Sequence, residues 1–158
     1  MEVGIVLNPA AGGGRAANLM PEAEAELRRL GVNGRIETAK APGDLAPLVL
    51  SFLQRGISRV LVAGGDGTLN IVLNGLAGLI ADGTARTSLE LGILPLGTGN
   101  DFAHALCLPA DIRAAVRRAV PGTPRLVDVC RLNNRLFLNA SGAGLDARVA
   151  ASSLRIEA

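Results

Sequence analysis

Residues 59–76 read RVLVAGGDGTLNIVLNGL, and this stretch decides the fold class. Its first part, from Arg59 to Ala63, is a short apolar run typical of a buried strand, and the part from Leu69 to Leu76 is typical of an apolar helix. The glycines in the turn between them allow backbone angles that are closed to other residues. A strand that enters a helix through such a turn is the building unit of parallel α/β sheets.

The same alternation continues on both sides of this stretch. Further strands are predicted at residues 3–7, 34–39 and 91–94, and further helices at residues 18–30, 45–53 and 111–119, with a short helix after Asn100. We place Pro21 in the first turn of its helix and predict that Asp44 caps the N-terminus of the next one. The chain is therefore expected to be an α/β protein, with a mostly parallel sheet and helices on both faces.

The pattern changes after residue 120. Pro121-Gly122-Thr123-Pro124 is typical of a linker, and residues 126–132 and 136–140 flank Asn133-Asn134 as the strands of a β-hairpin do. We predict a first α/β domain at residues 1–120 and, at residues 125–158, the first strands of an incomplete β-rich second domain. A hairpin by itself is marginally stable in water. It is expected to pack on the first domain or on a second copy of the chain, as a homodimer.

The composition is that of a globular chain without a strongly charged surface. Hydrophobic residues make up 49% and aromatic residues 2% of the 158 residues, so the core is expected to consist of Leu, Val, Ile and Ala. The formal net charge of +2 argues against nucleic acid as a partner. No apolar run reaches the about 18 residues of a membrane span, and we expect a cytoplasmic chain. Cys107 and Cys130 lack metal-site spacing and are expected to be reduced, buried thiols.

The turn at residues 64–68 has the composition of a phosphate-binding site. Its glycines let a phosphate approach the main chain, and Thr68 with the N–H groups after it opens a helix whose positive end favours an anion. Asp66 can hold a Mg²⁺ ion that bridges to phosphate, or it can orient the turn through backbone N–H groups. The alternative is a tight strand-to-helix junction with Asp66 as a plain N-cap. Neither a P-loop nor a dinucleotide-binding GxGxxG motif is present.

Two further turns follow strands in the same way. Residues 8–14 read NPAAGGG after the first strand, and residues 95–103 read PLGTGNDFA after the strand at 91–94. Taken alone, the second of these is equally a turn whose Asn100 and Asp101 cap the next helix. Because ligands of such sheets bind at the carboxyl ends of the strands, we expect all three turns to converge on one edge.

Five motifs in this order carry a resemblance to a known family. They are NPAAGGG (8–14), GGDGTLN (64–70), NGL (74–76), PLGTGNDFA (95–103) and NASGAGLDARV (139–149), and they cover nearly the whole chain. Together they resemble the catalytic domain of the diacylglycerol kinase-like lipid kinases, which include bacterial diacylglycerol kinases and the sphingosine and ceramide kinases. The resemblance implies ATP- and Mg²⁺-dependent phosphoryl transfer to the hydroxyl of diacylglycerol or a related lipid, with the lipid pocket in a β-rich second domain.

The resemblance also implies which residues contact ATP. They are Asn8, Pro9, Ala10, Ala11, Gly12, Thr38, Gly64, Gly65, Asp66, Gly67, Thr68, Leu69, Asn70 and Thr98. Asp66 is the implied Mg²⁺ ligand. The general base is expected beyond residue 158, so residues 1–158 alone are expected to bind ATP without turnover. The chain departs from the family pattern at Ile71, where Glu is common, and at His104, where Arg is frequent.

Other interpretations stay open. An NAD kinase-like protein shares GGDGT, although NPAAGGG and PLGTGNDFA argue against it, and a non-catalytic nucleotide-binding module is the alternative from another class. Arg113, Arg117 and Arg118 could attract anionic lipid at a membrane surface, but the solvated face of a surface helix is favoured. Asp101 and Asp146 are expected to have structural roles, at a helix start and at a junction into the second domain.

Overall fold

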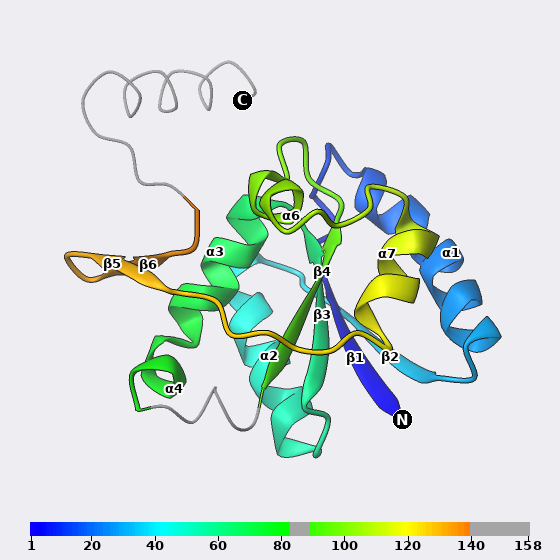
Figure 1. Cartoon of the computed structure of the whole chain (residues 1–158), viewed down its shortest axis with the longest axis horizontal. Coiled ribbons are helices and arrows are strands. Elements are labelled where there is room, and N and C mark those ends of the chain that lie inside the picture. Colours follow the sequence, from blue (N-terminus) through cyan, green and yellow to red (C-terminus); the bar gives the residue numbers. More distant parts are fainter. Residues whose placement is uncertain (83–88, 140–158) are drawn as a thin grey trace.

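The computed structural model describes residues 1–82 and 89–139, and it contains a parallel four-stranded sheet. The strand order is β2-β1-β3-β4, and the strands are β1 (Glu2–Leu7), β2 (Asn33–Thr38), β3 (Arg59–Gly64) and β4 (Glu90–Pro95). Every neighbouring pair in this sheet is parallel, as the alternation of strands and helices predicts (Figure 1).

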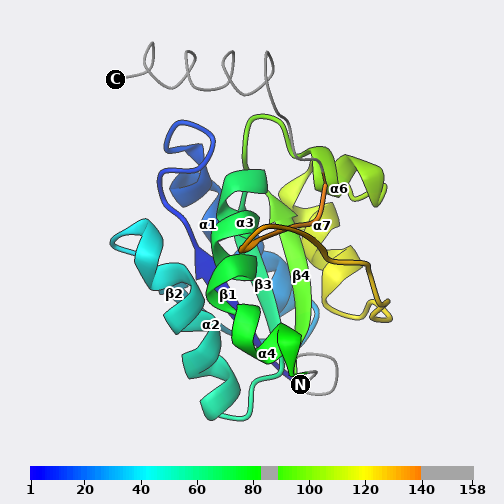
Figure 2. The same ribbon diagram turned by 90° about the vertical axis from the view of Figure 1, so that its left-hand side faces the viewer.

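Helices cover both faces of the sheet. On one face lie α1 (Arg15–Arg29) and α7 (Ile112–Ala119), and on the other lie α2 (Leu45–Gln54) and α3 (Asp66–Gly75) (Figure 2). Shorter helices connect these elements, namely η1 (Pro42–Asp44), α4 (Ala77–Ala81) and α6 (Asp101–Ala105). The predicted α/β fold with helices on both faces is confirmed.

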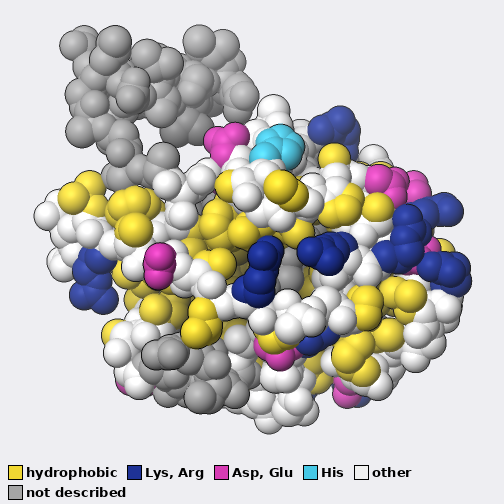
Figure 3. All heavy atoms as spheres, viewed as in Figure 1, with side chains coloured by type: hydrophobic (Ala, Val, Ile, Leu, Met, Phe, Trp, Pro, Cys, Tyr) yellow, Lys and Arg dark blue, Asp and Glu magenta, His cyan; other side chains and the backbone are white. Residues whose placement is uncertain are grey.

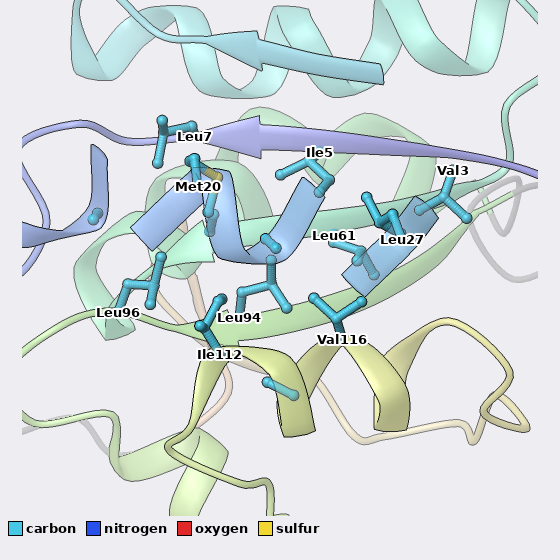
Figure 4. Packing of buried hydrophobic residues seen from close by; sticks show 14 of the residues in the cluster. Val3, Ile5, Leu7, Met20, Leu27, Leu61, Leu94, Leu96, Ile112 and Val116 are labelled. Atoms are coloured by element: carbon cyan, nitrogen blue, oxygen red, sulfur yellow. The ribbon is translucent and has the colours of Figure 1, made fainter. Parts of the chain in front are cut away.

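Each strand divides its side chains between two cores, because successive residues of a strand point to opposite faces. Between the sheet and the α1–α7 pair lies one core (Figure 4), which includes Val3, Ile5, Leu7, Leu61, Leu94, Met20, Leu27, Ile112 and Val116. The opposite core contains Val6 and the fully buried Phe52 of α2. Phe52 packs so closely on β1 that a Cβ added to Gly4 would lie 2.7 Å from its ring. Glycine at position 4 is therefore needed for α2 to reach the sheet.

The segment after α7 forms a hairpin, as predicted, but its first strand is shorter than the predicted 126–132. β5 (Cys130–Leu132) and β6 (Arg135–Phe137) pair antiparallel through a turn in which Asn133 has a φ of 52°. Residues 126–129 are not in a strand, because β6 is long enough to pair only with residues 130–132. The hairpin lies beside α3 (Figure 1), and Leu136 is only 5% exposed. Of the two packing partners expected for the hairpin, the first domain is thus the one observed, and homodimerisation stays a prediction. Residue 140, the predicted end of the second strand, lies outside the described residues.

Two predictions about helix starts are wrong. The first helix begins at Arg15, so Pro21 lies inside it and not in its first turn. This early start is possible because Gly14, with a φ of 87°, turns the chain directly into the helix. Asp44 makes no capping bond to α2, because η1 runs straight into that helix and Asp44 already has helical angles. Its carboxylate instead accepts the N–H groups of Lys40 and Ala41, each at 2.9 Å.

The cysteines are free, as predicted, but both Cys107 and Cys130 are exposed, and the expectation that they are buried is wrong. Cys107 lies just after α6 with a φ of 54°, and Cys130 begins β5. Across residues 1–82 and 89–139, no helix is both long and apolar enough to cross a membrane.

Candidate functional site

The carboxyl ends of β1, β3 and β4 meet at one edge of the sheet. In the parallel register, Leu7 pairs with Ala63 and Gly64 pairs with Pro95. The ladder continues past the strand ends, because the N–H of Asn8 donates to the carbonyl oxygen of Ala63 at 3.0 Å. All three glycine-containing turns therefore begin side by side, as the sequence predicts.

Close backbone contacts join these turns. A Cβ added to Gly65 would lie 2.8 Å from the Cα of Gly97, and a Cβ on Gly97 would come closer still to Gly65. Gly12, whose φ is +61°, is packed so that a Cβ would collide with the carbonyl oxygen of Leu96. Glycine is required at these positions because the neighbouring main chain leaves no space for a side chain. Gly97 was not among the predicted site residues. Its position in a Gly-rich turn that follows a strand was the sequence feature that could have identified it.

Asn8 and Thr68 connect the first turn to the second. The Nδ2 of Asn8 donates to the Oγ1 of Thr68 at 2.8 Å, and its Oδ1 accepts the N–H of Ala10 at 3.2 Å. Thr68 is 4% exposed and packs against Gly64, where a Cβ would overlap the threonine side chain. Both predicted site residues thus help to hold the turns together.

Asp66 connects the second turn to the third. Its Oδ2 accepts the N–H of Asp101 and its Oδ1 accepts the N–H of Phe102, both at 3.0 Å. These are the first two residues of α6, so the carboxylate caps a neighbouring helix. The carboxylate thus binds backbone N–H groups, as one predicted alternative has it, but these groups belong to α6 and not to its own turn. Asp66 is not the N-cap of α3, because Gly65 holds that position.

The side chain of Asn100 stabilises the third turn through hydrogen bonds to the main chain of the same turn. It has left-handed backbone angles (φ 56°, ψ 38°), its Oδ1 accepts the N–H of Gly97 at 2.9 Å, and its Nδ2 donates to the carbonyl oxygen of Gly97 at 2.8 Å. A rigid turn beside Gly65 is the result. Asn100 was not predicted as a site residue, and the local signal for it was its position three residues after a glycine.

The start of α3 is open to an anion. Gly65 precedes the helix, and no side chain caps it. The N–H groups of a first helical turn have no partner within the helix, and the helix dipole makes this end positive. Gly67 is exposed, and nothing lies within 4 Å of where its Cβ would be. A phosphate can therefore approach the main chain here.

Next to this helix start lies a pocket of about 190 Å³ between α3, α6, the last residue of β6 and the two residues that follow it. Five of its lining residues are apolar, namely Leu69, Leu73, Phe102, Phe137 and Leu138, and Asp66, Asn70, Asp101 and Asn139 complete it. The two carboxylates lie near each other, since a Cβ on Gly99 would be 3.4 Å from Oδ2 of Asp66 and 3.7 Å from Oδ1 of Asp101. Asp101 begins α6, as predicted, and it also contributes a carboxylate to this pocket.

The remaining residues predicted to contact ATP lie around this edge of the sheet and differ in how exposed they are. Thr38 is exposed at the end of β2, and Thr98 is exposed in the third turn. Pro9 and Ala10 belong to the first turn, and Ala11 is buried in the α1–α7 core. Leu69 is 6% exposed.

Three residues singled out in the sequence have other surroundings. Asn70 donates to the carbonyl oxygen of Leu136 at 3.2 Å and so faces the hairpin. Ile71 packs against the core on the α2 side. His104 is exposed in the last turn of α6. Asp146, and all of the motif at 139–149 after Asn139, lie outside the described residues.

The arginine cluster of α7 pairs mainly with α1. Arg113 lies 3.1 Å from Glu22 and Arg117 lies 3.3 Å from Glu26. Figure 3 shows basic and acidic side chains interspersed on the side of the molecule where α1 and α7 lie. Arg118 is exposed and has no carboxylate partner among the described residues. These pairs favour the structural interpretation of the cluster over lipid attraction.

A parallel α/β sheet with glycine-built turns at the carboxyl ends of three strands defines a class of domain that binds its ligand at that edge. The family described as "Diacylglycerol kinase catalytic domain" matches residues 2–132, and the chain belongs to this family. This confirms the resemblance drawn from the motifs.

Relatives and solved structures agree with this assignment. The chain is 36% identical over 140 residues to the diacylglycerol kinase of Staphylococcus haemolyticus, covering 89% of this chain and 41% of the relative. It is 37% identical over 142 residues to a protein of Chromohalobacter salexigens named "Probable lipid kinase YegS-like", covering 89% and 44%. The crystal structure of a diacylglycerol kinase from Bacillus anthracis superposes with a TM-score of 0.68 at 32% identity, covering 87% of this chain and 46% of that one. The chain thus spans less than half the length of these relatives.

Proposed function

We propose that this chain is the nucleotide-binding part of an ATP- and Mg²⁺-dependent lipid kinase. The reaction would transfer the γ-phosphoryl group of ATP to a hydroxyl of diacylglycerol or a related lipid. The observation that carries the proposal is the close packing of Gly65 on Gly97 beside the uncapped start of α3. The names of the relatives, diacylglycerol kinase and lipid kinase, support the substrate class.

The phosphates of ATP would lie against the start of α3. Here the free N–H groups of the first turn and the positive end of the helix favour an anion. Because Gly67 has open space at its Cβ position, no side chain blocks the approach of a phosphate to the main chain. Asn8 and Thr68 would keep the first and second turns at a fixed separation while the nucleotide binds.

The carboxylate of Asp66 also fits Mg²⁺ when phosphate is present. Residues 1–82 and 89–139 contain no group of three or more His, Cys, Asp or Glu that could hold a metal alone. Mg²⁺ usually keeps several waters and takes one or two carboxylates together with substrate phosphates. A carboxylate has about four lone-pair sites, so Asp66 can cap α6 and still offer an oxygen, with Asp101 beside it.

Catalysis in this scheme comes from positioning. When bound, Mg²⁺ would neutralise charge on the phosphates, as in other phosphoryl transfers. The residues of this chain would bind the triphosphate, hold the turns rigid and align it with an acceptor hydroxyl in the neighbouring 190 Å³ pocket. We place the general base beyond residue 158.

A glycine substitution tests the proposed phosphate contact. Gly67→Val adds a side chain in open space at the second residue of α3, so the fold should persist while the approach of a phosphate is blocked. We expect calorimetry with MgATP to show at least about a tenfold loss of affinity, equal to ~1.4 kcal/mol. Gly78→Val is the matched control, since Gly78 is the second residue of α4 and also has open space. Equal affinity of the two variants for MgATP would contradict the proposal.

A further inference from the structure

The hairpin is joined to the first domain by a small set of contacts around one residue. In the part of the chain that the structure describes, the hydrogen bonds between β5–β6 and the other elements all reach the main chain of Leu136. They come from Asn70 and Asn74, one turn apart on α3. The residues of β5 are all exposed, so the hairpin meets the domain through β6, where the side chain of Leu136 is also buried.

Asn74 binds Leu136 as a neighbouring strand would. Its Nδ2 donates to the carbonyl oxygen of Leu136 at 2.9 Å, and its Oδ1 accepts the N–H of the same residue at 2.9 Å. Residues in a hydrogen-bonded antiparallel pair exchange the same two bonds. Nδ2 of Asn74 also donates to the carbonyl oxygen of Asn70 at 2.9 Å, which fixes the orientation of the carboxamide.

The position of β6 decides where one wall of the pocket lies. Phe137, Leu138 and Asn139 follow directly after Leu136, and they line the 190 Å³ pocket together with residues of α3 and α6. A shift of Leu136 along α3 would carry these three residues with it. The carboxamide of Asn74 is therefore placed to control the distance between this wall and the two carboxylates.

We propose that Asn74 is a positioning residue, which docks β6 on α3 and so sets the wall of the acceptor pocket. The inference rests on the proposed function, because that function assigns the lipid hydroxyl to this pocket. Asn74 would act through Leu136 and is not among the residues proposed to contact the nucleotide or the metal. Its loss should alter the use of the lipid and leave nucleotide binding unchanged.

Amide exchange of Leu136 tests the docking without any assay of activity. We expect Asn74→Ala to speed exchange of the Leu136 amide by about tenfold, the effect of losing about one net hydrogen bond. Amides of β1 and β3 should keep their protection. Asn74→Asp keeps an acceptor for the Leu136 N–H and should retain part of the protection. Asn18→Ala is the control, because Asn18 is an exposed asparagine of α1. Wild-type protection of Leu136 in Asn74→Ala would overturn the docking role.

Kinase assays of the full-length gene product with dispersed dioctanoylglycerol test the consequence. Asn74→Ala should raise the KM for dioctanoylglycerol several-fold, while the KM for ATP and the Kd for MgADP stay at wild-type values. Faster Leu136 exchange with an unchanged KM for the lipid would overturn the positioning role. A wild-type enzyme that phosphorylates no lipid, together with the expected exchange result, would contradict the proposed function and leave Asn74 as the residue that docks the hairpin.

Discussion

The carboxylate of Asp66 has two roles, because it caps α6 and is also the proposed ligand of Mg²⁺. Replacing it with alanine removes both acceptors for the N–H groups of Asp101 and Phe102. Such a variant loses stability as well as metal binding. Asparagine separates the two effects, because its Oδ1 still accepts a hydrogen bond while its charge is gone.

We therefore predict that Asp66→Asn abolishes most of the gain in ATP affinity that Mg²⁺ provides. The amide has no charge to attract a hard cation, which prefers anionic oxygen. Calorimetry of ATP binding with Mg²⁺ and with EDTA measures this gain directly. Thermal unfolding should show a smaller loss for Asp66→Asn than for Asp66→Ala, whose two lost bonds are worth roughly 1–3 kcal/mol. A gain from Mg²⁺ equal to that of the wild type would show that Asp66 is a cap alone.

At the scale of elements, α1 and α7 are held together by a carboxylate in their interface. Glu26 is 5% exposed and lies 2.7 Å from Arg29 of its own helix and 3.3 Å from Arg117 of α7. Arg29, and after it Arg117, holds the pKa of the Glu26 carboxyl below its usual value of 4.5. Because the pKa is lower in the folded state, the ionised carboxylate stabilises the fold above the usual value, and this contribution is lost as the pH falls through the lower one.

We predict that the free energy of unfolding decreases less at acidic pH in Glu26→Gln than in the wild type. Urea unfolding between pH 7 and pH 3 should show that the wild type loses more free energy of unfolding than the variant below about pH 4.5. Glu24→Gln is a suitable control, because Glu24 lies on the same helix but its ion pair is more exposed and longer. Glu24 is 46% exposed, and its carboxylate is 3.6 Å from Arg28 in an i,i+4 pair. Parallel curves for the wild type and Glu26→Gln would contradict the role of this carboxylate.

At the scale of the whole molecule, the chain holds a proposed donor site and only one part of a proposed acceptor site. Its relatives are more than twice as long as the matched region, since the matches cover 41% and 44% of them. The division into residues 1–120 and 125–158 stays a prediction. Within residues 1–82 and 89–139, the contact between β6 and α3 is where the hairpin packs on the α/β domain.

We predict that residues 1–158 bind MgATP but do not phosphorylate dioctanoylglycerol above background. General-base catalysis is typically worth ~10² to 10⁴-fold, and the base is expected outside this stretch. A version extended by about 150 residues, the usual size of a domain, should be active under the same conditions. Equal rates of phosphate transfer from both would contradict this, and would place the catalytic base within residues 1–158.

The sequence by itself determined the α/β alternation, the parallel sheet and the three glycine-containing turns at one edge. These features follow from local periods of apolar residues and from where glycine must occur, so they can be predicted from short windows. Only the tertiary structure decided which side chains meet, such as Asn8 with Thr68, Asp66 with the start of α6, and Asn74 with Leu136. These partners are 35 to 62 residues apart in the chain. Their meeting depends on strand register and helix packing, which no local pattern specifies.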